Sequence, residues 1–296
     1  MDRELWMILC RAIRGAVRAA GASRRVMFSD LLILKMYIWS VAHDRPLWWA
    51  CEKQHYHSVF RPRRLPSVSQ FCRRVKSDLF QRHLQAVHQA LTQNCQWQGL
   101  NFLDGKPLEV GNYSRDPEAK TGFAAGRLGK GYKLHALVTQ DRRIATWCVL
   151  PMNVHEMKVA QAMIGQGPTM SRMSPGTVFM ADGNYDAHVF HKQIAAAGGS
   201  LYIKPRGVAR HPVTRRQMGG ARRQLIEFWQ KLPEQAQWIY NERVNVEGTF
   251  SNLCSYGGGL GPLPAFVRRL ERVRRWTGAK ICLYHARLEQ RSPRCA

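Results

Sequence analysis

Hydrophobic side chains recur with a helical period in the first third of the chain. Four segments show the 3.6-residue repeat of an amphipathic helix and are predicted helices: 4–20, 27–42, 67–76 and 79–94. Ser29 or Asp30 can cap the second of these helices, and Ser67 opens the third. Residues 1–97 are therefore predicted to form an all-helical domain.

The pattern changes to strands after residue 97. Short runs rich in β-branched and apolar residues predict five strands: 101–103, 132–139, 144–150, 177–181 and 200–204. Helices are predicted between and after them: 155–164, 187–197, 221–231, 234–253, 268–275 and 277–290. The order β-β-β-α-β-α-β predicts an α/β domain with a mixed sheet over residues 98–296. The Gly-rich segment 119–131 is predicted to be a loop, and 205–223 a basic insert.

Two of the predicted strands run directly into an aspartate that is followed by glycine, at Asp104 and Asp182. Each pattern places a carboxylate at the rim of the sheet, where the chain turns. Carboxylate oxygens are the ligands that hard divalent cations prefer. Either aspartate alone could equally be a turn-forming residue, so a third acidic group is needed to define a site.

The predicted helix over 234–253 supplies candidates for that third group. Tyr240, Arg243 and Glu247 follow one another at i, i+3 and i+7, so on a continuous helix they share one face. Glu242 lies about 140° around the helix from Glu247, so only one of the two glutamates can share that face. We select Glu247, which taken alone would be an ordinary solvated helix charge.

The net charge narrows the class of partner. Lys and Arg number 45 against 20 Asp and Glu, which gives a formal charge of +25. Such an excess indicates a polyanion such as nucleic acid, with a membrane surface as the competing explanation. No apolar stretch reaches the ~18 residues of a spanning helix and no signal peptide is evident, so a soluble cytoplasmic protein is expected. The eight cysteines include no Cys-x-x-Cys pair, which predicts free thiols.

The basic residues concentrate in 1–97 and 204–296, on either side of the two aspartates. Segment 46–77 can form a helix-turn-helix whose second helix enters a DNA groove, although an amphipathic helix with a solvated basic face has the same pattern. The basic insert is the other candidate region for phosphate contacts. The candidate DNA-binding residues of these two regions are Arg73, Arg74, Lys76, Arg206, Arg215 and Arg216.

The run Tyr240-x2-Arg243-x3-Glu247 resembles the signature Tyr-x2-Arg-x3-Glu-x6-Lys of a large group of DDE transposases from bacterial insertion sequences. Other segments are similar to segments of these enzymes: 103–105, 131–135, 153–156 and 181–186. The resemblance covers about residues 98–290. One position departs from the signature, because Cys254 stands where its lysine is expected. The DNA contact associated with that lysine is then lost or passed to a nearby arginine.

The resemblance implies an RNase H-like core and two-metal phosphoryl transfer. It implies that Asp104, Asp182 and Glu247 bind two Mg²⁺ ions, for which Mn²⁺ can substitute, and that Tyr240 and Arg243 contact DNA phosphate. The reaction would be hydrolysis at the ends of the element, followed by attack of the freed 3′-hydroxyl on target DNA. The implied partners are the double-stranded inverted-repeat ends and the target DNA, with a homodimer in the synaptic complex of a nucleoid-associated bacterial protein.

Two other functions are compatible with the same residues. A nuclease with the same core would cut DNA without joining it. A catalytically silent, transposase-derived protein would only bind DNA; the three acidic residues argue against this function, and Cys254 argues for it. His135 and His155 are expected to be structural.

Overall fold

The computed structural model describes residues 1–23, 26–95, 97, 99–124, 126–165, 175–205, 220–255 and 259–292. The chain forms two compact units, Met1–Asn94 with Ser251–Ala296, and Cys95–Phe250. The sequence pattern places the boundary at residue 97 and keeps everything beyond it in one domain. The structure differs at the C-terminal end, because the last helix packs against the N-terminal helices within the first unit.

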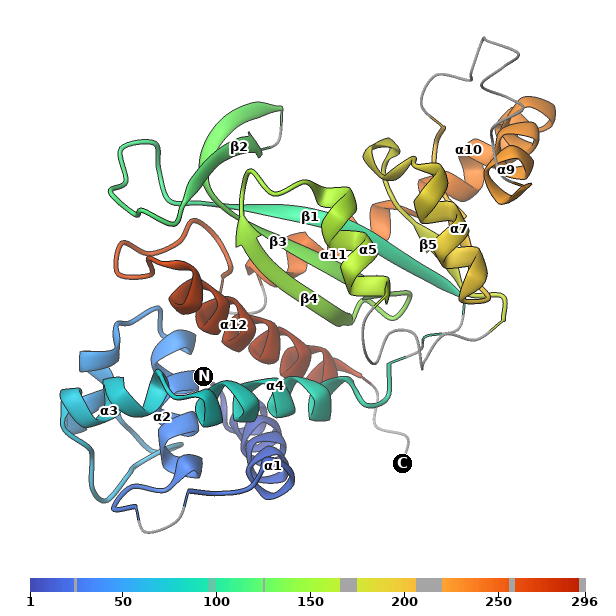
Figure 1. The fold of residues 1–296 in the computed structure, drawn as a ribbon. Coiled ribbons are helices and arrows are strands. Elements are labelled where there is room, and N and C mark those ends of the chain that lie inside the picture. Colours follow the sequence, from blue (N-terminus) through green and yellow to red (C-terminus); the bar gives the residue numbers. More distant parts are fainter. Residues whose placement is uncertain are drawn as a thin grey trace. The chain divides into compact units, whose positions relative to one another are not determined.

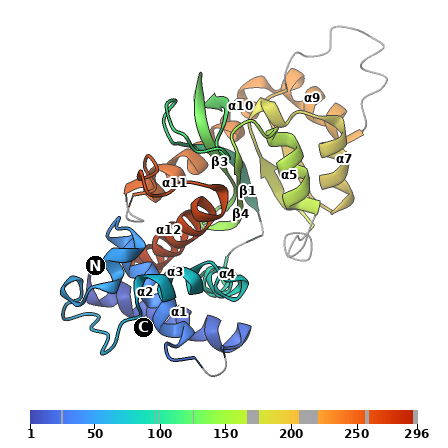
Figure 2. The ribbon, with the colours of Figure 1, turned by 60° about the vertical axis from the view of Figure 1, so that its left-hand side comes forward.

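The first unit is a bundle of helices. Its members are α1 (Arg3–Ala20), α2 (Asp30–Ala42), α3 (Val68–Val75), α4 (Asp78–Thr92) and α12 (Leu270–Arg291), with two short 3₁₀ helices, η1 (Leu47–Cys51) and η2 (Lys53–His55). Helix α12 lies beside α4, and both contact α1 (Figures 1 and 2). The four helices predicted in residues 1–97 are confirmed. Ser29, and not Asp30, caps α2, because its hydroxyl accepts from the Leu32 N–H.

The two C-terminal helices predicted over 268–275 and 277–290 are wrong. Arg269 has a positive φ of 68°, so the chain turns there and the helix begins only at Leu270. From Leu270 the helix continues without a break to Arg291.

Aromatic packing and paired charges hold the first unit together. The indole rings of Trp6 and Trp39 meet edge to face, with centroids 5.3 Å apart. The Lys280 side chain is fully buried, and its Nζ lies 2.6 Å from a carboxylate oxygen of Asp44. Because an unpaired buried charge is costly, this pair restricts how α12 can pack in the bundle.

The second unit is built on one mixed sheet. Its strands are β1 (Leu100–Glu109), β2 (Lys120–Ala124), β3 (Arg127–Thr139), β4 (Ile144–Pro151), β5 (Val178–Met180) and β6 (Ser200–Tyr202). They lie in the order β2-β3-β1-β5-β6, with β4 also paired to β3. Strand β3 is antiparallel to β1, β2 and β4, whereas β1, β5 and β6 are parallel. The predicted α/β class with a mixed sheet is confirmed.

The prediction of a loop over 119–131 is wrong, because this segment forms β2 and the start of β3. Its glycines allow backbones to approach closely. A Cβ atom on Gly131 would lie 2.3 Å from the Leu108 carbonyl oxygen, and one on Gly122 would lie 2.4 Å from the Met152 carbonyl oxygen. Glycine here is required by packing within the sheet, so its abundance does not indicate a loop.

Helices α5 (Glu156–Gly165) and α7 (His188–Ala196) lie beside each other on one face of this sheet (Figure 1). The core under them contains Leu103 of β1, Phe179 of β5 and Ile194 of α7. The 3₁₀ helix η3 (Gly183–Tyr185) connects β5 to the segment before α7.

The remaining helices are α9 (Gly220–Lys231), α10 (Pro233–Asn241) and α11 (Val244–Ser255). The single helix predicted over 234–253 is wrong, since a turn at Glu242 and Arg243 divides it. There the N–H of Glu242 bonds to the Ile239 carbonyl and that of Arg243 to the Tyr240 carbonyl, each three residues back. This tighter bonding changes the direction of the chain just before Glu247.

The close approach at Gly131 predicts a large difference between two glycine-to-alanine substitutions. Gly131→Ala should lower the free energy of unfolding by about 1–3 kcal/mol, because the backbone of β1 must move away from the new methyl group. Gly248→Ala is the control: no atom lies within 4 Å of the added Cβ, and alanine favours the helix by about 1 kcal/mol. Urea denaturation measures both, and equal effects would contradict the assigned packing.

Candidate active site

Asp104 and Asp182 are brought together by the pairing of β1 with β5. In this parallel pair Phe102 stands opposite Met180 as the last pair of the ladder, and the two aspartates that follow, Asp104 and Asp182, line one cavity. Side chains alternate between the faces of a strand, and Leu103 and Ala181 belong to the core under α5 and α7. Asp104 therefore points to the opposite face of the sheet, and Asp182 follows the end of β5 close enough to act on its charge.

The sequence pattern predicted that the first strand ends at Asp104, and this prediction is wrong. Strand β1 continues to Glu109 along β3, and it is the neighbouring β5 that ends at Met180. The edge of β1 is thus released from its parallel partner just before Asp104. The carboxylate is positioned by the end of β5, while β3 holds the strand that carries it.

The Asp104 carboxylate is largely buried, with 18% of its side chain exposed. Burial raises its pKa to about 6, and the nearby carboxylates of Asp182 and Glu156 act in the same direction. Two contacts oppose this shift: the Arg243 guanidinium, at 3.2 Å, and the Gly105 N–H, at 2.8 Å. Negative charge is therefore concentrated at this point, and one arginine balances part of it.

Asp182 also organises the turn that follows it. Its Oδ1 accepts from the backbone N–H of Asn184 at 2.7 Å, and its Oδ2 from the Asn184 side-chain amide at 2.9 Å. These two bonds cap η3 and hold the carboxylate in place. Asp182 is thus a turn-forming residue, and the same hydrogen bonds orient its carboxylate near Asp104.

Arg243 links the first aspartate to the third predicted acidic residue. Its guanidinium contacts Asp104 at 3.2 Å and Glu247, on the first turn of α11, at 3.1 Å. Burial would lower the pKa of Arg243, but the surrounding carboxylates, with Asp104 foremost, raise it. The Glu247 side chain is 60% exposed. Among the described residues no group of three or more acidic, His or Cys side chains is close enough to hold a metal ion.

A cavity of about 690 Å³ opens beside the two aspartates. Asp104, Asp182 and Asn184 line it together with a buried ion pair, in which the Lys133 Nζ lies 2.6 Å from Glu156 Oε1. The Gly105 that follows Asp104 makes room for this pair, because a Cβ there would lie 3.0 Å from the Lys133 side chain. Glu247 is not among the residues that line this cavity.

Lys133 and Glu156 were not selected as site residues from the sequence. The signal was present, because they lie in 131–135 and 153–156, the two segments that resemble parts of the transposases. Spacing alone does not show that Lys133 and Glu156 meet, because their contact joins β3 to the start of α5.

His135 lies on β3 at 3% exposure, and neither of its ring nitrogens has a hydrogen-bond partner among the described residues. Burial lowers its pKa to about 4, so the ring is neutral near pH 7. His155 is exposed, and its Nδ1 accepts from the Met157 N–H at 3.3 Å.

The candidate DNA-binding residues have different environments. Arg73 and Lys76 are exposed on or beside α3, whereas Arg74 is bound to the Asp30 carboxylate and the Phe28 carbonyl. Tyr240 is half-buried, and its ring meets Trp229 edge to face at 5.9 Å. The other three candidates lie outside the described residues: Arg206, Arg215 and Arg216. At the position of the signature's lysine, the Cys254 thiol donates to the Leu260 carbonyl at 3.1 Å.

The raised pKa of Asp104 predicts a pH-dependent gain in stability for Asp104→Asn. The folded state holds this proton up to about pH 6, so the stability that the proton contributes is lost as the pH rises through 6. The asparagine variant has no titratable carboxyl at this position, so it does not lose this stability as the pH rises. In metal-free buffer, the difference in unfolding free energy between variant and wild type should therefore become more favourable to the variant by about 1 kcal/mol from pH 5 to pH 8.

Chemical denaturation at the two pH values measures this difference. Asp78→Asn, at an exposed position on α4, controls for the loss of one carboxylate. If the stability advantage of Asp104→Asn over wild type stays constant or shrinks toward pH 8, the pKa of the Asp104 carboxyl is not raised.

Comparison with known families identifies the family to which this chain belongs. A family model described as a transposase DDE domain matches residues 99–282, a span that contains Asp104, Asp182 and Glu247. No curated protein and no solved structure matches the chain. Within the described part of the chain, no helix has the length and apolarity needed to cross a membrane. Because the matched segment is more than half of the sequence, the chain belongs to the family of transposase DDE domains.

Proposed function

We propose that this chain is a DNA transposase that cleaves the ends of an insertion sequence and joins them to target DNA. In the first step a water oxygen attacks the phosphorus at the element's end, the bond to the 3′-oxygen breaks, and that oxygen takes a proton to become a 3′-hydroxyl. In the second step this hydroxyl loses its proton, its oxygen attacks a phosphorus of the target, and a target 3′-oxygen leaves.

The observation that supports the proposal is the proximity of the Asp104 and Asp182 carboxylates, within a chain that belongs to a transposase family. Both line one cavity, which offers space for a phosphodiester next to the carboxylates. Glu247 is the third acidic residue of the proposed site, held through Arg243.

The donor chemistry fits the divalent metal ions that the family implies, while the described side chains do not lie close enough together to form a three-residue metal site. Asp104, Asp182 and Glu247 offer hard oxygen donors, and the Arg243 cation already contacts two of these carboxylates. In the proposed enzyme these three residues would hold Mg²⁺ or Mn²⁺, and the bound ions would activate the attacking oxygen as Lewis acids and stabilise the leaving oxygen. Arg243 and Tyr240 contact the DNA phosphate, since Tyr240 lies near the end of α10 and Arg243 in the turn that leads into α11 and Glu247.

The strand order supports an RNase H-like core for this unit. Three antiparallel neighbours, β4-β3-β1, are followed by the parallel strands β5 and β6. We also propose that the helical residues 1–97 bind DNA, with the exposed Arg73 and Lys76 as contacts, and that the part of 98–296 that lies in the second unit carries the chemistry. The partners are inverted-repeat ends and target DNA at the nucleoid, held by a homodimer in the synaptic complex.

Asp182→Asn should abolish cleavage of element-end DNA while DNA binding is retained. The change keeps the shape of the side chain and removes its charge, so the cleavage rate should fall by about 10³-fold or more. Gel assays with labelled end DNA and Mg²⁺ measure cleavage, and a plasmid target reveals joined products, which a nuclease would not form. Asp78→Asn, with an exposed aspartate of α4, is the matched control. Normal cleavage by Asp182→Asn would show that the site is assigned wrongly.

Arg243→Gln should tighten the binding of Mn²⁺ to the DNA-free protein. The guanidinium contacts two of the proposed metal ligands, Asp104 and Glu247. Its removal takes away a positive charge that repels the metal ion and competes for these carboxylates, so the affinity should rise by about tenfold. Isothermal titration calorimetry in metal-free buffer measures this affinity. Arg142→Gln controls for net charge, since Arg142 contacts the Asn245 side chain, which is outside the proposed ligand set. Equal or weaker Mn²⁺ binding by Arg243→Gln would contradict the proposed ligand set.

A further inference from the structure

A small cavity lies within the first unit, where residues of α2, α3 and α12 meet. Its volume is about 100 Å³, and every residue that lines it belongs to the N-terminal or the C-terminal part of this unit. Leu47, Val75 and Trp276 form part of its apolar wall. The space exceeds the ~30 Å³ of one water molecule, so it admits a group of several atoms.

Arg275 of α12 is a buried cation at this cavity. The residue is 8% exposed, and within the described part of the chain its guanidinium makes no hydrogen bond and no ion pair. Its nitrogens are not among the fully buried side-chain atoms, so they are open toward the cavity. Glu271, one turn earlier, acts on its charge but is bound to Arg274 at 2.6 Å. Burial lowers the pKa of Arg275, yet a guanidinium stays charged near pH 7.

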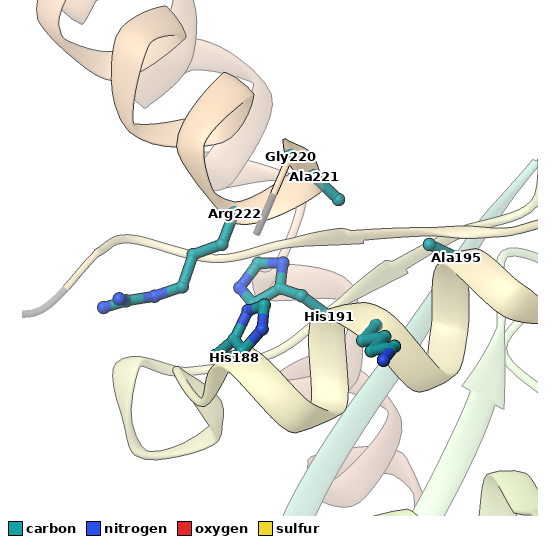
Figure 3. Close-up of a pocket in the computed structure, with 7 residues that line it drawn as sticks. His188, His191, Ala195, Gly220, Ala221 and Arg222 are labelled. Carbon is teal, nitrogen blue, oxygen red and sulfur yellow. The ribbon is translucent and has the colours of Figure 1, made fainter. Parts of the chain in front are cut away.

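The cavity between α7 and α9 in Figure 3 shows by contrast what is unusual about Arg275. Arg222 lines that cavity, but its Nε and Nη2 donate to the two carboxylate oxygens of Asp186, at 2.6 and 2.8 Å. The charge of Arg222 is therefore already balanced by a protein group. Among the described residues Arg275 has no such carboxylate, and a buried charge without a partner is costly.

The Tyr37 hydroxyl is a second donor without a partner at the same cavity. The residue is 3% exposed and its ring meets Phe80 edge to face, but no described residue forms a hydrogen bond with its hydroxyl. Burial raises the pKa of Tyr37, so the hydroxyl keeps its proton and can donate. Arg275 acts on the same hydroxyl, which places the two donors near each other. Buried donors without acceptors select a ligand that accepts hydrogen bonds.

Exposed cations surround these two buried donors. Arg45, Lys76 and Arg272 are exposed residues that line the cavity, and none of the described residues that line it is acidic. The Arg272 guanidinium donates to the Phe266 carbonyl at 2.7 Å, which holds this side chain at the cavity. Several positive charges around a planar guanidinium favour an anion with more than one oxygen, and phosphate has the geometry that arginine binds at two points.

We propose that this cavity binds a phosphate group of the DNA backbone through Arg275 and the Tyr37 hydroxyl. The choice of DNA as the source of the phosphate rests on the proposed function, whereas the selection of a phosphate rests on the cavity. Two observations favour DNA. Lys76, which is already a proposed DNA contact, lines the cavity, and Arg73 is exposed on the preceding turn of α3. The DNA-binding surface of the first unit then includes the C-terminal helix α12 as well as the N-terminal helices.

Two tyrosines give a matched test. Tyr37→Phe removes a hydroxyl that has no partner in the folded chain, so the free energy of unfolding in phosphate-free buffer should be unchanged, while DNA affinity should fall by about tenfold. The Tyr56 hydroxyl donates to the Ala50 carbonyl at 2.5 Å and lies outside the cavity. Tyr56→Phe should therefore lower the free energy of unfolding and change the DNA affinity by less than about twofold.

Arg275→Met tests the charge. It should lower DNA affinity by at least about tenfold and reduce the slope of log affinity against log salt by about one, because a cation that contacts phosphate is lost. Arg18→Met removes the same charge from an exposed position on α1, outside the cavity, and should leave the slope unchanged. Fluorescence anisotropy of a labelled duplex, with the full chain in EDTA at several salt concentrations, measures both quantities. Urea denaturation in the same buffer verifies that each variant is folded.

Titration calorimetry with inorganic phosphate separates the two sources of the ligand. Phosphate should bind to wild type and to Tyr56→Phe, and its affinity should fall by at least about tenfold in Arg275→Met. If it does so while both cavity variants keep the wild-type DNA affinity, the assignment to DNA is overturned. If neither phosphate nor DNA binding differs between the cavity variants and their controls, the whole proposal is overturned. A chain that binds no DNA at all would contradict the proposed function, whereas the phosphate titration would still decide whether the cavity binds an anion.

Discussion

The parallel pairing of β1 with β5 is the constraint on which the candidate site depends. Only three residue pairs form this ladder, Leu100 with Val178 through Phe102 with Met180. The register is nevertheless strict, because a slip by one residue would turn Phe179 and Ala181 out of the core under α5 and α7. The same alternation that buries these apolar side chains places Asp104 on the opposite face, close to Asp182 at the end of β5. Packing of the core thus determines the geometry of the carboxylates.

Burial of the acidic residues creates a need for positive charge that the chain meets locally. Asp104 lies close to Asp182 and Glu156, and its raised pKa reflects both burial and these neighbours. Arg243 contacts Asp104 from one side, and Lys133 neutralises Glu156 on the wall of the neighbouring cavity. Both cations come from other elements than the aspartates, so the site is balanced only when the sheet and its helices are assembled.

The turn after Asp182 continues this arrangement away from the carboxylates. Three residues separate Asp182 from Asp186, and Asp186 contacts the first turn of α9 through Arg222. A near-neutral middle segment within a strongly basic chain has a physical explanation in the same terms, because acidic residues are needed at the site and basic ones around it.

The sequence by itself determined the helices of residues 1–97, the mixed sheet and the two aspartates. These follow from local periodicity, from Ser caps such as Ser29, and from apolar runs that end in Asp-Gly. Only the tertiary structure decided the rest. Glycines that read as a loop serve close backbone contact at Gly131, a turn at Arg243 divides a helix that looked continuous, and Lys133 meets Glu156 across two elements. Each of these depends on groups distant in the chain, and their energies are absent from any local pattern.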